Sequence, residues 1–393
     1  SVPSETSTAY SGPIAISSST LLRARVFDTG LAPGPLVSEG YVALAADVQN
    51  FTSDIPIVLL ENFGAGGVPG NSYQFVYMAI FEPTVDRASL RNAPDLGTRA
   101  GIKIRGSSTA GQPKPNLALE TWDEKNADRD TTPLGFPSES DWVLHAPYNF
   151  DLALMRNPFI FELSNQVGRY AVRTRFVEVY LNTGGGSLAQ ADYFGVYSFM
   201  EKIKRGPDRV DVERMPSSYV TEPLVTGGYM SKIDRLDPGD SGFGAGGQTM
   251  GWVYPKEEIV APAQVAWYQA YVNAFVSVLN GAGYRDPVNG YIRYIDPDSW
   301  VDHHILNVLA MNVDALRLSG YMFKGRERRL EMGPIWDFDR SMDSTDGRDD
   351  NPRAWKGTGD ATDFFNYPWW QRLFTDLDFW QRWKDRWQEL RKD

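Results

Sequence analysis

The N-terminal half of the chain alternates apolar and polar positions with the two-residue period of half-buried β-strands. Residues 20–27 alternate apolar side chains with Arg23 and Arg25, which gives one dry and one wet face. Residues 177–181 and 194–201 are predicted to pair as a hairpin across the three glycines at 184–186. Further strands are predicted at 57–60, 73–81, 101–105 and 117–119.

From Pro262 onward the apolar positions recur with the period of a helix. Pro262 suits a first helical position, and the apolar stripe that follows it ends at Gly281. Another helix is predicted to begin at Asp296-Pro297, and a third at 369–390. An isolated earlier helix is expected at 152–167, and the glycine-rich stretch 235–258 is predicted to be a mobile loop. Strands come first and helices second, which indicates an α+β protein.

A group of carboxylates stands on the helical half. Apolar neighbours around Asp337 and Asp339 predict a short buried strand or strand-like turn, in which residues two apart point to the same side. Asp314 comes 23 residues before Asp337 (337 − 314 = 23), just past a helical segment. Burying unpaired like charges together costs several kcal/mol or more, so such a group is expected to hold a cation. Metal-dependent phosphoryl transfer needs this combination of metal ligands and a base.

A plainer interpretation of the same carboxylates is that they cap a turn or pair with the adjacent Arg340.

The strand at 101–105 runs into a Gly/Ser loop and returns through Lys114, an arrangement that can present backbone N–H groups to phosphates. The alternative for this loop is an ordinary hairpin.

Composition narrows the function further. The net charge of −11 argues against nucleic acid or an anionic membrane as the main partner, and no run of 18 apolar residues predicts a membrane span. Cysteine is absent, which excludes disulfides, thiol catalysis and cysteine zinc sites. Only three histidines occur, and His303 and His304 are adjacent, which argues against a histidine-rich metal site or a Ser-His-Asp triad. Ser1 follows no signal peptide and is expected to be a processing boundary within a larger multidomain protein.

Several short motifs occur together in one order over residues 55–390, and in that order they resemble the CotH kinase family, named for a spore coat protein. The motifs are Arg105-Gly106-Ser107-Ser108 with Lys114, Trp142-Val143-Leu144, Met155-Arg156-Asn157, Gly195-Val196-Tyr197 with Glu201, Gly227-Gly228-Tyr229, Tyr254-Pro255, Asn312-x-Asp314 and Trp336-Asp337-Phe338-Asp339. Residues 1–44 resemble the C-terminal part of a chitobiase-type β-sandwich module, which usually serves as a spacer or an attachment piece.

The resemblance implies an atypical two-lobed protein-kinase-like fold over residues 55–393, with a mixed β-rich N-lobe and a helical C-lobe. A partial β-sandwich segment at 1–44 precedes it. It further implies ATP with Mg²⁺ or Mn²⁺ as cofactors, and phosphorylation of Ser or Thr on extracellular or cell-surface proteins. The expected location is secreted or at the surface of a bacterial cell.

Carried over residue by residue, the resemblance assigns Asp314 to catalysis and Asp337 to the metal, with Asp339 supporting the metal site. Phosphate or nucleotide contacts are assigned to Arg105, Gly106, Ser107, Ser108, Lys114 and Lys232. Glu201 is a candidate near the adenine or as a partner for a lysine, and Glu162 is its rival. The alternative for Lys114, Lys232 and Glu201 is ordinary solvated strand charge.

One position departs from the family pattern. Kinase catalytic loops place an Asn five residues after the catalytic Asp to hold a second metal, and here that position is Ser319. A hydroxyl is a poorer metal ligand than an amide oxygen. The sequence therefore leaves open an active kinase and a non-catalytic pseudokinase or adhesion module in which the acidic cluster holds structural Ca²⁺. A third hypothesis is carbohydrate binding by the aromatic-rich C-terminal third, in a chain that has 12 Trp.

Overall fold

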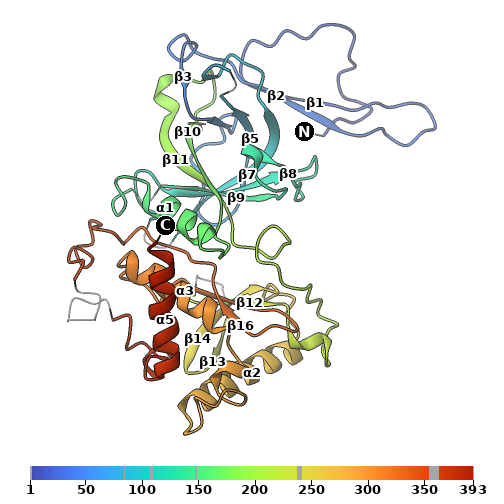
Figure 1. Cartoon of the computed structure of the whole chain (residues 1–393). Coiled ribbons are helices and arrows are strands. Elements are labelled where there is room, and N and C mark those ends of the chain that lie inside the picture. Colours follow the sequence, from blue (N-terminus) through green and yellow to red (C-terminus); the bar gives the residue numbers. More distant parts are fainter. Residues whose placement is uncertain are drawn as a thin grey trace. The chain divides into compact units, whose positions relative to one another are not determined.

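The structure is a computed structural model that describes residues 2–83, 85–106, 109–146, 148–236, 241–353 and 363–392. The chain forms two compact units. The first, which we call the barrel unit, contains Ser1–Tyr148 and Thr174–Lys202. The second, which we call the sheet unit, contains Asn149–Arg173 and Ile203–Asp393. Both are drawn in Figure 1, and each is described by itself.

Seven strands of the barrel unit close on themselves (Figure 1). Six neighbouring pairs are antiparallel, and the barrel is closed by a parallel pairing of β10 with β4, in which Glu178 lies opposite Ile57 and Asn182 opposite Glu61. The predicted hairpin is confirmed as β10 and β11. In spatial order the strands are β10 (Thr174–Asn182), β11 (Tyr193–Glu201), β9 (Asp141–His145), β8 (Asn116–Trp122), β7 (Leu96–Arg105), β5 (Gln74–Phe81) and β4 (Ile57–Glu61).

Strand β4 is buried along its whole length, so its sequence is a continuous apolar run instead of an alternation. One face points into the barrel. On the other face, Ile57 and Leu59 pack with Tyr77 of β5 and with Val48 and Phe51 from the preceding segment. Two short strands, β3 (Thr52–Ser53) and β6 (Ala88–Ser89), pair beside this cluster. Residues just before the barrel therefore cover its outer surface.

Residues 2–41 contain one two-stranded antiparallel sheet, formed by β1 (Thr20–Ala24) and β2 (Val37–Tyr41). The expected dry apolar face and wet basic face are not observed here: Ala24 and Val26 are exposed, whereas Arg23 is mostly buried and pairs with Glu124 at 3.1 Å. The described residues of this segment form a single hairpin, and the prediction that residues 1–44 are the C-terminal part of a β-sandwich module stays a prediction.

The sheet unit is organised on five antiparallel strands in the order β13 (Gly242–Ala245), β14 (Gln248–Tyr254), β12 (Tyr229–Ile233), β15 (Gly320–Lys324) and β16 (Leu330–Met332). Helices α2 (Pro262–Asn280) and α3 (Pro297–Leu309) share one apolar core with this sheet, together with α4 (Trp370–Leu373) and α5 (Leu377–Leu390). A further helix, α1 (Arg156–Gln166), belongs to the same unit.

The predicted starts of two helices in this unit are confirmed. Helix α2 begins at Pro262 and is followed by Gly281, and α3 begins at Pro297 after Asp296, whose carboxylate accepts the Ser299 N–H at 3.3 Å. The predicted helix at 369–390 is divided into α4 and α5. Residues 235–258 were wrongly predicted to be a loop, because they contain the hairpin of β13 and β14.

The expected atypical two-lobed kinase-like fold with a helical C-lobe is wrong. The described chain is rich in β-structure, with a closed seven-stranded barrel where a mixed N-lobe sheet was expected, and it has only five α-helices. The second half is built on a sheet, because short strands at 242–254 and 320–332 lie between the helices. These strands are short and contain glycine, so their alternation of apolar and polar residues is weak. The helical patterns beside them are strong, and the sequence therefore predicted helices for this half of the chain. No helix in the described ranges is long and apolar enough to cross a membrane.

A tight contact inside the barrel unit gives a first prediction. A Cβ at Gly101 of β7 would lie 2.3 Å from the indole ring of Trp122, which is buried and donates its Nε1–H to Glu120 at 2.8 Å. Gly101→Ala should therefore lower the free energy of unfolding by about 1–3 kcal/mol, the usual cost of overpacking. Urea unfolding measures it. Gly111→Ala is the matched control, because nothing lies within 4 Å of that position. Equal stabilities of the two variants would contradict this packing.

Candidate functional site

The loop after α3 is tied to the segment around Asp337 by one buried amide. Asn312 Nδ2 donates to Asn307 Oδ1 at 3.1 Å and lies 3.4 Å from the carbonyl oxygen of Asp337. Its Oδ1 accepts the backbone N–H of Asp314 at 3.2 Å. The side chain of Asn312, three residues after α3, therefore contacts the backbone of two of the three predicted site aspartates.

The segment that carries Asp337 and Asp339 is not a strand. Strand β16 ends at Met332, and Asp337 has a φ of 66°, in the left-handed region. Phe338 is fully buried, and its N–H donates to Asn157 Oδ1 of α1 at 2.7 Å. Of the two forms predicted for this segment, a short strand and a strand-like turn, the strand is wrong: irregular backbone held by α1 presents the two carboxylates.

Backbone hydrogen bonds join the two loops. The N–H of Val313 donates to the carbonyl of Arg340 at 3.3 Å, and the N–H of Met342 donates to the carbonyl of Ala310 at 2.9 Å. Ser319 Oγ lies 3.4 Å from Asp337 Oδ2. Asp314, Ser319, Asp337 and Asp339 are consequently gathered in one part of the sheet unit.

The backbone is strained at this place. Six of the eleven non-glycine residues with positive φ in the described chain fall between positions 311 and 343: Met311, Leu316, Ser319, Asp337, Met342 and Asp343. Such conformations cost about 1–3 kcal/mol each and persist only where the surrounding structure fixes them. They concentrate at functional sites, and here they coincide with the predicted one.

The carboxyl group of Asp339 is in an environment that disfavours its charge. Its pKa is raised well above its usual value, first by burial, then by the neighbouring charge of Asp337 and by a hydrogen bond between the two; Asp314 adds a smaller effect. Arg340 acts in the opposite direction. A cation bound between these carboxylates would relieve the repulsion.

Asp314 itself is held by arginines. Its Oδ1 accepts a hydrogen bond from Arg317 and lies 3.8 Å from Arg348 Nη2. Its side chain is mostly buried, with 17% exposed.

Lys232 also belongs to the sheet unit. It lies on β12 opposite Tyr321 of β15, the strand that begins directly after Ser319. Its Nζ is 3.6 Å from Asp234 Oδ2. The predicted lysine is therefore in an ion pair on the strand next to the acidic loops.

The other predicted nucleotide residues belong to the barrel unit. Arg105 ends β7, and Gly106 follows with a φ of 97°; a Cβ there would lie 2.3 Å from Thr109 Oγ1. Ser107 and Ser108 lie outside the described residues. Lys114 donates to the carbonyl of Val196 and lies 4.8 Å from the centre of the Tyr197 ring, and burial lowers its pKa. Glu201 is buried at the end of β11, whereas its rival Glu162 is exposed on α1 and accepts from Gln166 at 2.9 Å.

Two residues that position the site were given no role from the sequence. Asn157 stood within a recognised motif, but only the structure shows that it binds the Phe338 N–H. Arg156 pairs with Asp151 at 2.8 Å and donates to the carbonyl of Asp343 at 2.8 Å, so it joins α1 to the loop after the aspartates. The sequence feature that could have indicated their role is the polar pair Arg156-Asn157 inside a segment with an apolar face.

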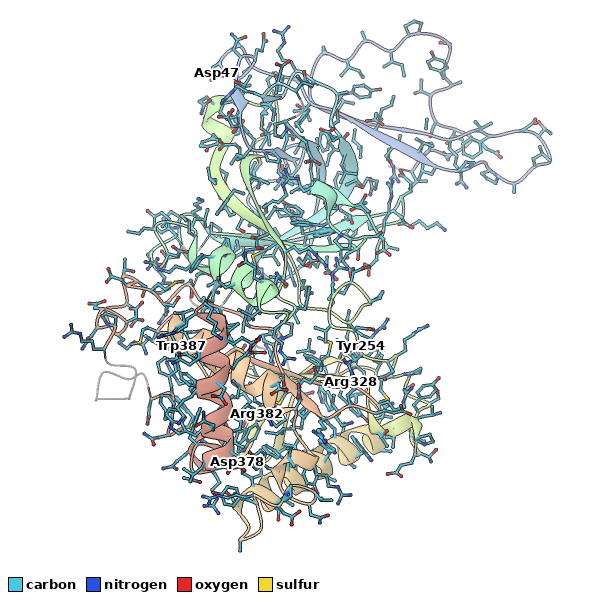
Figure 2. The ribbon with its side chains drawn as sticks, in the orientation of Figure 1. Asp47, Tyr254, Arg328, Asp378, Arg382 and Trp387 are labelled. Carbon is cyan, nitrogen blue, oxygen red and sulfur yellow. The ribbon has the colours of Figure 1, made fainter. Side chains whose placement is uncertain are left out.

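Two cavities of the sheet unit can be compared with the predicted site residues. One of about 730 Å³ is lined by α3 and α5, including Asp378 and Arg382, which Figure 2 labels on α5. Another of about 190 Å³ is lined by His303 and Arg328 among others. Neither is lined by a predicted site residue. The loop geometry, and not a cavity, is what identifies the candidate site.

Comparison with known proteins agrees with the motif order. A family model described as CotH kinase protein matches residues 102–393. The chain belongs to the CotH kinase protein family. A model described as Fn3 associated matches residues 1–41. A search of curated proteins found no match. Family membership supports a kinase-like function at the level of the family.

The hydrogen bond that anchors the acidic segment to Asn157 can be tested by substitution. Asn157→Ala removes the acceptor for the buried Phe338 N–H, which should lower the free energy of unfolding by about 1–3 kcal/mol. Amide hydrogen exchange at Phe338 should become faster. Gln166→Ala, at the exposed end of the same helix, is the control and should stay within about 0.5 kcal/mol of the parent. Unchanged exchange at Phe338 in Asn157→Ala would contradict the anchoring role.

The two histidines of α3 predict how stability depends on pH. Burial lowers the pKa of His303 to about 4, and that of His304 to about 3. His304 Nδ1 is 3.1 Å from the Trp383 Nε1–H donor, and its Nε2 is 2.9 Å from the Phe364 carbonyl oxygen. A depressed folded-state pKa contributes stability that is present above the unfolded value of about 6.5 and is lost as the pH falls towards the folded value.

Stability should therefore fall between pH 6.5 and 4, by about 1.4 kcal/mol per pH unit for each such histidine. His303→Gln removes one of the two histidines that take up a proton on unfolding, so it should reduce this slope by about 1.4 kcal/mol per pH unit. Urea unfolding at pH 7, 6 and 5 provides the measurement. An identical slope in parent and variant would show that folding does not lower the pKa of His303.

Proposed function

We propose that this protein is an ATP- and divalent-metal-dependent protein kinase that phosphorylates Ser or Thr on extracellular or cell-surface proteins. Membership of the CotH kinase protein family supports a kinase-like function. The observation that carries the proposal is the convergence of Asp314, Asp337 and Asp339, with burial and like charge raising the pKa of Asp339. We place the protein outside the cell, secreted or at the bacterial surface.

Asp337 and Asp339 would hold the metal ion. Within the described ranges, no three His, Cys, Asp or Glu side chains form a metal-binding group by themselves. Mg²⁺ usually takes one or two carboxylates and completes its shell with water and substrate phosphates, so two carboxylates fit a metal that binds together with the nucleotide. The metal would neutralise phosphate charge. Structural Ca²⁺ takes six to eight oxygen ligands, a set that this donor group supplies less well.

Asp314 would accept the proton of the acceptor hydroxyl. It is the predicted catalytic residue, its carboxylate is held by arginines, and its loop is hydrogen-bonded to the metal-binding segment. Lys232 of the sheet unit would contact the nucleotide. The nucleotide contacts that the family resemblance assigns to Arg105, Gly106, Ser107, Ser108, Lys114 and Glu201 stay predictions. Most of the rate in such a reaction comes from positioning and charge neutralisation.

The proposal is tested by thermal unfolding with ATP and Mg²⁺ or Mn²⁺, followed by transfer of labelled phosphate to a serine-rich protein. At a hundredfold excess over the dissociation constant, binding should stabilise the parent by about 2.7 kcal/mol. Asp337→Asn should abolish this gain, and asparagine suits the left-handed backbone at that position. Asp314→Ala should keep the gain but abolish transfer.

Asp385→Asn, an exposed change on α5, is the control and should keep both binding and transfer. Stabilisation by ATP and metal without any transfer would favour a pseudokinase. The same stabilisation by Ca²⁺ alone, with no effect of ATP, would favour a structural calcium site in an adhesion module.

A further inference from the structure

The arginines around Asp314 form part of a longer network of alternating charges. Arg348 contacts Asp314 and makes a two-point contact with Asp346, through Nε to Oδ1 and through Nη2 to Oδ2 at 2.7 Å. Arg340 Nη1 lies 3.2 Å from the same Asp346 Oδ2. The order Asp314, Arg348, Asp346, Arg340 therefore runs from the predicted catalytic residue to the neighbour of Asp339.

We propose that Arg348 is a positioning residue, which orients the carboxylate of Asp314 for the phosphate transfer proposed above; the inference rests on that proposed function. Arg348 and Arg317 both approach Oδ1 of Asp314. A carboxylate held at one oxygen from two directions has a defined plane, and its Oδ2 is then the atom that takes the proton of the acceptor hydroxyl. Arg348 does not touch the reacting atoms and acts through Asp314.

Hydrogen bonds within the loop that carries Arg348 fix its conformation. Ser344 donates its backbone N–H to Asp349 Oδ2 at 2.8 Å and its hydroxyl to Asp349 Oδ1 at 3.0 Å. The N–H of Asp346 then donates to Ser344 Oγ at 3.2 Å. The hydrogen bonds with Asp346 raise the pKa of Arg348, and those with Arg348 lower the pKa of Asp346. Both groups are thereby kept charged.

The other end of the network is fixed by an aromatic ring. The guanidinium of Arg340 lies 3.9 Å from the centre of the Phe150 ring. Arg340 also favours the charged form of Asp339. The network therefore joins the loop of the base to the loop of the predicted metal ligands, so that the two groups of carboxylates keep one relative position.

Positioning, and not stability, is the expected contribution. Arg348 is 30% exposed, and single ion pairs at such exposure contribute little to folding. Misplacement of a reacting group by about 1 Å can cost on the order of a hundredfold in rate. Lysine would keep the charge but not the planar fork that binds Asp346 at two points.

The opposite interpretation is that Arg348 masks Asp314 and must leave before reaction. The two interpretations predict opposite signs, so the rate of the Arg348→Met variant distinguishes them. Positioning predicts a kcat lower by about 10- to 100-fold, with unchanged KM for ATP and unchanged metal-dependent stabilisation. Arg348→Lys and Asp346→Asn should each lose part of the rate. A higher kcat in Arg348→Met would establish masking and overturn positioning.

Two further measurements complete the test. Arg382→Met is the matched control, because Arg382 forms an exposed pair with Asp298 on α3 and should leave kcat unchanged. Adding Arg348→Met to Asp314→Asn should cost no further activity, since a residue that acts through Asp314 has no effect once that carboxylate is gone. Additive losses, or a normal kcat in Arg348→Met, would overturn this inference alone. An inactive parent protein would overturn the proposed function and the inference together.

Discussion

The candidate site depends on two buried amide side chains that satisfy irregular backbone. Asn157 accepts the Phe338 N–H, and Asn312 accepts the Asp314 N–H while its amide group lies near the carbonyl of Asp337. Buried backbone outside helices and sheets must find such partners, because an unpaired group costs about 1–3 kcal/mol. These contacts explain how a left-handed Asp337 can persist in a packed interior. They also connect α1 and α3 to one turn, so the core of the sheet unit sets the geometry of the carboxylates.

The carboxylates in this region have two kinds of charged neighbour. Asp339 is buried beside Asp337, and burial together with that neighbouring charge raises its pKa. Asp314 and Asp346, in contrast, are offset by Arg317, Arg348 and Arg340. The proposed metal ion would bind at the first pair. This division matches the separate tasks of metal binding and proton acceptance in the proposed kinase reaction.

Family membership and architecture have to be kept apart. The chain belongs to the CotH kinase protein family, yet a closed barrel stands where a mixed N-lobe sheet was expected, and a five-stranded sheet with helices stands where a helical lobe was expected. The acidic loops can still be assembled, because they need only two neighbouring segments held by a rigid core. Function is therefore argued from the site and not from the fold.

The sequence by itself determined the helix limits at Pro262 and Pro297, the β10–β11 hairpin, the family and the identity of the carboxylates, because caps, periods and motifs act over a few residues. Tertiary structure alone decided the parallel closure of β10 on β4, the hairpin at 242–254, the turn at Asp337 and the contact of Arg348 with Asp314. These features join distant segments or override local preference. They depend on which surfaces pack together and on which buried polar groups find hydrogen-bond partners. The hydrophobic period of a single segment contains neither kind of information.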